Sequence, residues 1–149
     1  MFSEQARSLS MDRLTPQQRS YTMSRIHQSG TAFEKKVFRE LRRRRVYFQK
    51  HYARVMGKPD IAVPTKKRAV FLHSDFWHGW QYGRWKDVLP SRFWIDKIES
   101  NRKRDVKVKR SLRRLGWEVL VIWEHSLRSN PERTMGKIVK FLKGRVVRR

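Results

Sequence analysis

Acidic and imidazole side chains gather in one short stretch of the sequence, GKPDIAVPTKKRAVFLHSDFWH at residues 57–78. The stretch contains Asp60, His73, Asp75 and His78. Carboxylate oxygens are the ligands that Mg²⁺ prefers, and a histidine side chain can take a proton from water near neutral pH. These residue types therefore predict a site for metal-dependent hydrolysis.

A β-hairpin would bring these groups together. Two short apolar runs, Ile61-Ala62-Val63 and Ala69-Val70-Phe71-Leu72, are separated by residues of the kind found in turns. The strands of a hairpin lie side by side. Asp60 at the head of the first run therefore comes close to His73, which ends the second.

The rest of the chain alternates between helix and strand patterns. Residues 117–123, WEVLVIW, are the clearest buried strand, and residues 46–52 are a further strand. We expect helices at residues 20–27, from Thr31 after a break at 28–30, at 92–115 up to Gly116, and from Pro131 onward, with 79–91 irregular. This order predicts an α/β fold, a mixed central β-sheet flanked by helices.

The length of 149 residues suits one domain with a real core. We therefore expect a single domain over residues 1–149, with a flexible arm at 1–19 and a basic tail at 143–149. The helix that starts near Thr31 carries a capping box, with Glu34 three residues after the Thr31 N-cap. Its expected buried stripe is Phe33, Val37, Phe38 and Leu41, and that of the last helix is Met135, Ile138, Val139 and Leu142.

The helix at 92–115 combines an apolar stripe with two polar residues. The stripe is Trp94, Ile98, Val108, Leu112 and Leu115. Asn101 and Asp105 lie on the same face, where an unpaired carboxylate is costly. We expect the imidazoles of residues 57–78 to be the partners of Asp105. The other faces of this helix are rich in lysine and arginine.

The net charge of the chain limits the classes of molecule that the protein is expected to bind. The formal net charge is +24, which makes nucleic acid the expected counter-polymer and predicts salt-sensitive binding. An acidic membrane surface is a weaker alternative, because no apolar run approaches the length of a membrane-spanning helix and the first residues resemble no signal peptide. The chain has no cysteine, which excludes disulfides and cysteine-based zinc sites. An intracellular protein that faces DNA fits best.

Several separate motifs together resemble one nuclease family. Pro59-Asp60 followed by a second strand resembles the restriction-endonuclease-like PD-(D/E)xK core, although Phe71-Leu72-His73 departs from the usual acid-x-Lys. That departure, together with Phe76-Trp77-His78, TAFEKKV at 31–37, RFWIDKIESNRKRD at 92–105 and GWEVLVIWE at 116–124, is similar to the very short patch repair (Vsr) mismatch endonucleases. The similarity covers about residues 20–128.

The resemblance implies a role for each matching residue. Asp60 and the backbone carbonyl of Leu72 would bind Mg²⁺, and Glu34 would hold metal-bound water. His73 would contact the scissile phosphate. His78 would be the general base, oriented by Asp105.

The resemblance also implies contacts with DNA. Phe76, Trp77 and Trp94 would insert between bases, and Lys97 and Asn101 would reach base edges. A mismatched base pair is already poorly stacked, which lowers the cost of such insertion.

The sequence departs from the family at a structural zinc site. The positions that match its cysteine and histidine ligands are Asp75, Trp80, Tyr82 and His125, and two of these are not ordinary zinc ligands. We therefore expect no zinc, and expect Trp80, Tyr82 and Trp85 to pack this loop instead. Asp75 could then be an additional acid of the active site.

Simpler structural explanations exist for each of these residues. Glu34 could serve only the helix cap, Asp60 only a turn, and His73 only the core. Asp105 could pair with an arginine. The aromatic residues could be core, and the basic helix face could be merely solvated.

Three functions are compatible with these observations. The favoured one is a Mg²⁺-dependent endonuclease that nicks duplex DNA next to a T:G mismatch. The alternatives are a homing or restriction-type nuclease that cuts a specific site in fully paired DNA, and a DNA-binding module without catalysis. In the favoured case the partner is double-stranded DNA rather than a membrane or a small molecule. The protein would act as a monomer in the cytoplasm, near the nucleoid.

Overall fold

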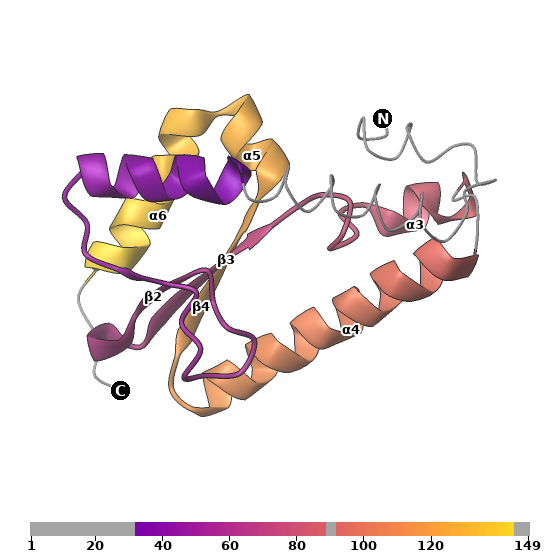
Figure 1. The fold of residues 1–149 in the computed structure, drawn as a ribbon, viewed down its shortest axis with the longest axis horizontal. Coiled ribbons are helices and arrows are strands. Elements are labelled where there is room, and N and C mark those ends of the chain that lie inside the picture. The colour runs from indigo at the N-terminus through magenta and orange to yellow at the C-terminus, as the bar shows by residue number, and fades with distance from the viewer. Residues whose placement is uncertain (1–31, 89–91, 145–149) are drawn as a thin grey trace.

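A mixed β-sheet lies at the centre of the fold, between helices (Figure 1). The computed structural model describes residues 32–88 and 92–144. The sheet contains β1 (Gln49–Lys50), β2 (Ile61–Val63), β3 (Arg68–His73) and β4 (Glu118–Trp123), in that spatial order. The expected α/β architecture is confirmed.

The register of the sheet follows from the hairpin and one crossover. β2 and β3 are antiparallel, with Ile61 opposite Val70, and a short 3₁₀ turn at Pro64–Lys66 joins them. β3 and β4 are parallel, with His73 opposite Trp123. A parallel pair requires a long connection, and α4 (Arg92–Arg114) lies within it.

Alternating residues of the strands face two different cores. Val70, Leu72 and Ile122 belong to the larger core, together with apolar residues of the helix at 32–43, of α5 (Glu124–Ser129) and of α6 (Pro131–Lys143). Ala62 and Ala69 belong to a second core on the opposite face, with Val108 and Leu112 of α4. Figure 1 shows α4 on one side of the sheet, and the helix at 32–43, α5 and α6 on the opposite side.

The expected apolar stripes are largely confirmed. Phe33, Val37, Phe38 and Leu41 are buried, as are Met135, Ile138 and Leu142, and Val139 packs partly buried against them. On α4, the burial of Trp94, Ile98, Val108 and Leu112 is also confirmed. The expected burial of Leu115 is wrong, because α4 ends at Arg114 and Leu115 is 59% exposed. Gly116 follows with a positive φ of 83°, which suits glycine after a helix.

The strand expected at residues 46–52 is mostly wrong. Only Gln49–Lys50 forms a strand. Arg45 takes a positive φ and the Val46 amide donates to the Leu41 carbonyl, so these residues close the preceding helix instead. At the other end, His51 also has a positive φ, of 48°, which ends the strand.

Two further segments were not anticipated. The region 79–91, expected to be irregular, contains α3 (Tyr82–Trp85) and a 3₁₀ turn at Lys86–Val88. A short helix, α5, directly follows β4. The expected arm at 1–19, the helix at 20–27, the break at 28–30, the Thr31 cap and residues 145–149 of the tail lie outside the described residues. Among the described residues, no helix is both long and apolar enough to cross a membrane.

Candidate active site

Asp60 lies at the point where the hairpin meets the first described helix. Because Ile61 is opposite Val70, the residue before Ile61 reaches the end of β3, and Asp60 Oδ2 accepts a hydrogen bond from the Leu72 amide at 2.7 Å. Burial is the largest cause that raises the pKa of Asp60, the Leu72 hydrogen bond opposes it, and the negative charge of Glu34 adds to it, which together place the pKa at about 7. Leu72 therefore meets Asp60 through its amide, while its carbonyl stays a predicted metal ligand.

Glu34 and His51 complete a cluster around Asp60. Glu34 is in the first turn of the helix at 32–43, and burial raises its pKa as well. His51 Nε2 lies 3.5 Å from Glu34 Oε2, and His51 Nδ1 lies 3.9 Å from Asp60 Oδ1. The sequence interpretation did not include His51. The register that pairs Lys50 with Ile61 places His51 opposite Asp60, and no local pattern in the sequence indicates that pairing.

This cluster fits a divalent cation. One ligand atom from each of Glu34, His51 and Asp60 lies within 4.8 Å of the other two. The raised pKa values mean that two ionised carboxylates are costly here unless a positive charge compensates them. The carboxylates suit Mg²⁺, and an imidazole would also suit a softer ion such as Mn²⁺.

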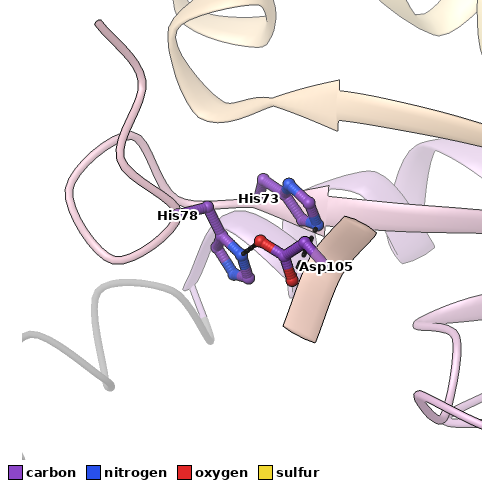
Figure 2. Close-up of side chains that lie close together, drawn as sticks. All are labelled: His73, His78 and Asp105. Carbon is purple, nitrogen blue, oxygen red and sulfur yellow. Dashed lines mark hydrogen bonds and ion pairs between the residues drawn. The ribbon is translucent and has the colours of Figure 1, made fainter. Parts of the chain in front are cut away.

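A second cluster joins His73 and His78 to Asp105 of α4 (Figure 2). His78 Nδ1 lies 2.7 Å from Asp105 Oδ2, and His73 Nε2 lies 4.0 Å from Asp105 Oδ1. The two imidazole rings stack, with centroids 3.7 Å apart and planes 4° apart. The expected pairing of Asp105 with an imidazole is thus observed, and the structure brings His73 into the same cluster.

The two histidines differ in what they can do with a proton. His73 is 6% exposed, and burial lowers its pKa to about 3, with the neighbouring His78 acting in the same direction. His73 is therefore neutral at pH 7. In His78, the bond from Nδ1–H to the carboxylate leaves Nε2 as the nitrogen that can accept a proton.

Both clusters line one cleft. The cleft has a volume of about 2150 Å³, and its walls include Glu34, His51, Asp60, His73, His78 and Asp105. One wall is formed by basic residues of α4: Lys97, Arg102, Lys103, Arg104, Lys109, Arg110, Arg113 and Arg114. A candidate cation site and a candidate base thus line the same cleft, and one wall of this cleft is positively charged.

The known proteins to which this chain is similar are named as endonucleases and nicking enzymes. The family model described as "DNA mismatch endonuclease Vsr" matches residues 11–84. The type II nicking enzyme V.XorIIP of Xanthomonas oryzae pv. oryzae is 36% identical over 119 residues, which are 78% of this chain and 86% of that protein. The corresponding enzyme V.HpaIIP of Haemophilus parainfluenzae is 33% identical over 141 residues, covering 93% of this chain and 100% of that protein. The chain belongs to the Vsr endonuclease family. The DNA mismatch endonuclease Vsr of Escherichia coli K12 is 33% identical over 117 residues, with 78% of this chain and 75% of that protein covered.

The three aromatic residues expected to insert between bases differ in their exposure to solvent. Phe76 is 1% exposed and Trp94 is fully buried, in a small core with Tyr82 and Ile98. Only Trp77 is half-buried at the edge of this core and lines the cleft. Insertion into DNA by Phe76 or Trp94 would therefore require this core to open.

The two polar residues expected at base edges also differ. Lys97 is exposed and lines the cleft. Asn101 Nδ2 donates to the Trp77 carbonyl at 3.0 Å, so its amide group ties α4 to the loop that follows β3.

Asp75, the possible additional acid of the active site, pairs with residues of α5 and is not among the residues that line the cleft. Asp75 Oδ1 is 2.7 Å from His125 Nδ1, and Asp75 Oδ2 accepts from Arg128 at 3.2 Å. Because β3 and β4 are parallel, the chain after β3 lies next to the chain after β4, and Asp75 turns toward α5 rather than toward Asp60.

The residues at the Vsr zinc positions do not fit a zinc ion. Trp80 stacks on His125, with ring centroids 3.8 Å apart. The Tyr82 hydroxyl donates a hydrogen bond to Glu99. Burial, and to a smaller extent this hydrogen bond, raises the pKa of Tyr82 to about 12, which disfavours the phenolate form. Trp80 and Tyr82 thus pack the loop, as expected. The side chain of Trp85 lies outside the described part of the chain.

Proposed function

We propose that the protein is a divalent-cation-dependent endonuclease that uses Mg²⁺ to nick duplex DNA next to a T:G mismatch. The coarser function, a DNA endonuclease, follows from membership of the Vsr family. The observation that carries the finer proposal is the single cleft that holds the Asp60 cluster, the His78–Asp105 pair and a basic wall. A phosphodiester lying in this cleft would face all three.

The chemistry divides between the two clusters. Asp60, His51 and Glu34 would hold the cation, which when bound would neutralise charge that develops on the phosphate and on the leaving oxygen. His78 Nε2 would take a proton from the attacking water, and Asp105 would hold the ring and stabilise the imidazolium form. His73, neutral and buried under the His78 ring, would fix the plane of that ring.

Binding of DNA would use α4. Its cleft-facing lysines and arginines would contact backbone phosphates, which gives affinity without sequence preference. Trp77 is the aromatic residue best placed to test base stacking, since it borders the cleft. The DNA would be bound by a monomer inside the cell.

A nicking assay tests the proposal. Supercoiled plasmid and short duplexes with either a T:G mismatch or full pairing would be incubated with Mg²⁺. We expect nicking of the T:G duplex, a loss of at least about 100-fold in the single-turnover rate of His78→Gln, and a similar loss in Asp60→Asn. Glu132→Gln is the matched control, because Glu132 pairs with Arg44 away from the cleft.

The possible outcomes separate the alternatives. Equal nicking in Asp60→Asn and in the unmodified protein would contradict the proposed cation site. Cleavage of one sequence in fully paired DNA, with no preference for the mismatch, would favour a homing or restriction-type nuclease.

A further inference from the structure

We propose that Asp75, His125 and Arg128 form a metal-free clamp that positions His78 for the reaction. The inference rests on the proposed function, in which His78 is the base, but it concerns a different set of residues. It also follows from the disagreement between the zinc positions of the family and the residues present here.

The clamp joins two segments that are distant in the sequence. The pairing of His73 with Trp123 brings the ends of β3 and β4 together, and Asp75 and His125 each lie two residues further on. The Asp75 carboxylate accepts from the His125 amide at 3.3 Å, lies 2.7 Å from the His125 ring Nδ1, and accepts from the Arg128 guanidinium at 3.2 Å. Three contacts therefore meet on one side chain that is only 6% exposed.

Two tryptophan rings stack with the His125 ring. Trp80 stacks on it with a centroid distance of 3.8 Å, and Trp123 lies at 6.3 Å on a nearly parallel plane, 28° from it. Trp123 also contacts the His73 ring edge-on, with centroids 5.2 Å apart. A packed series of rings thus runs from the clamp to the imidazole that stacks on His78.

The backbone makes the second connection. Asp75 and His78 lie in one compact turn, in which the His78 amide donates to the Ser74 carbonyl at 3.2 Å and the Trp80 amide donates to the Asp75 carbonyl at 2.9 Å. The Trp77 amide donates to the Ser74 hydroxyl at 3.2 Å. A shift of Asp75 would therefore move the turn that carries His78.

Charged groups of both signs meet around the clamp. Asp75 faces the cationic Arg128 and the His125 ring, and Glu124 is the second carboxylate in this group. Burial raises the pKa of Glu124, and the negative charge of Asp75 raises it further. A buried carboxylate with an arginine and an imidazole can hold two segments in one geometry, which is the task that a structural metal performs elsewhere.

The test compares Asp75→Asn with Glu132→Gln. Both substitutions remove one carboxylate from an ion pair with an arginine of a distant segment. The Glu132–Arg44 pair includes no residue of the turn, and the Glu132 side chain is 82% exposed. We expect Asp75→Asn to lower the single-turnover nicking rate by about 10- to 100-fold with duplex affinity within about twofold, because a displaced base loses rate rather than binding. Glu132→Gln should leave both unchanged.

Hydrogen exchange gives a readout that does not depend on activity. Asp75→Asn should speed exchange of the His78 and Trp80 amides by about tenfold or more, while amides of α6 exchange as before. Asp75→Glu should partly restore protection if the carboxylate is what matters. If the unmodified protein does not nick DNA, the proposed function fails, and the exchange data still decide whether the clamp exists.

Three results would overturn the clamp. One is unchanged exchange at His78 and Trp80 in Asp75→Asn. A second is a wild-type nicking rate in that variant while the unmodified protein is active. The third is one tightly bound zinc per purified chain by elemental analysis, with activity lost after chelation and not restored by Mg²⁺ alone.

Discussion

Burial shifts the pKa values of individual residues in the cleft. Asp60 and Glu34 are two acids whose burial raises their pKa values, and His73 is a histidine whose burial lowers its pKa. Perturbed groups of this kind cluster at functional sites because a reaction or a ligand needs them. The free-energy cost of ionising Asp60 in the folded protein can be measured without any assay of cleavage.

Asp60→Asn should change how stability depends on pH in a divalent-cation-free buffer. The folded pKa of Asp60, about 7, lies above the usual value of 3.8, so the folded state binds more protons between these pH values and stability falls as pH rises through them. Removing the carboxyl should therefore stabilise the cation-free protein at pH 7.5, by on the order of 2 kcal/mol. Urea unfolding of both proteins from pH 4 to 8 measures the difference, in which the opposite contribution of His73 cancels.

The same substitution should remove the stabilisation that the cation gives to the folded protein. Mg²⁺ should raise the melting temperature of the unmodified protein and have little effect on Asp60→Asn. A variant that is destabilised at pH 7.5 without the cation would contradict the buried, cation-dependent charge at Asp60.

His51→Ala should weaken the cation site. The His51 ring faces both Glu34 and Asp60, and the residue holds a positive φ that is unusual for a non-glycine residue. We expect the affinity for Mn²⁺ to fall by about tenfold or more. The affinity for Mg²⁺ should fall less, since an imidazole is a better ligand for the softer Mn²⁺. Calorimetric titration with each ion, with Glu132→Gln as control, measures this. Equal affinities in His51→Ala and the unmodified protein would exclude His51 from the site.

At the scale of elements, α4 contributes to the second core, to the small core around Trp94 and to the cleft. Its 23 residues extend about 34 Å, so its C-terminal half can pack on the sheet while Trp94 and Ile98 support the turn that carries His78. Asn101 and Asp105 lie between these regions and contact that turn directly. Close packing of α4 against the loop before β2 is therefore a requirement of the site.

Gly57→Ala should disturb that packing. A Cβ at Gly57 would lie 2.3 Å from Val108 Cγ1, and the positive φ of 83° adds strain for any other residue. We expect a loss of about 2 kcal/mol or more in the free energy of unfolding. Gly136→Ala is the matched control, because nothing lies within 4 Å of its Cβ and alanine in α6 should stabilise by about 0.5–1 kcal/mol. Denaturant unfolding of both variants measures the contrast, and equal stabilities would refute it.

At the scale of the whole molecule, charge dominates. The formal net charge of +24 opposes compaction in the absence of a counter-ion and attracts a polyanion. Salt should therefore have opposite effects on the two properties. It should stabilise the free protein and weaken its complex with DNA.

Raising NaCl from 50 to 500 mM should increase the melting temperature of the protein and lower its affinity for a duplex. For six to ten phosphate contacts, the affinity should fall by about 10³–10⁵ between 50 and 200 mM salt. Scanning calorimetry and fluorescence anisotropy measure the two effects. A melting temperature that falls with salt would contradict the role of self-repulsion.

Local patterns in the sequence were sufficient for much of the fold. Short apolar runs specify the hairpin and β4, and helical stripes specify which faces of α4 and α6 are buried. Both kinds of pattern depend on neighbours within a few residues. The sequence predictions failed where a short segment was compatible with more than one secondary structure. Arg45 and Val46 close a helix instead of starting a strand, and α5 is too short to show a clear helical period.

The candidate site was predictable only in its membership, and not in its contacts. Residue types and spacing indicated Asp60, His78 and Asp105, and the sequence by itself determined the basic, cysteine-free character of the protein. Tertiary structure decided that Asp75 meets His125 and that His51 meets Asp60, since each contact depends on the register between strands. Register joins residues that are far apart along the chain, and burial then selects which charged groups must find partners.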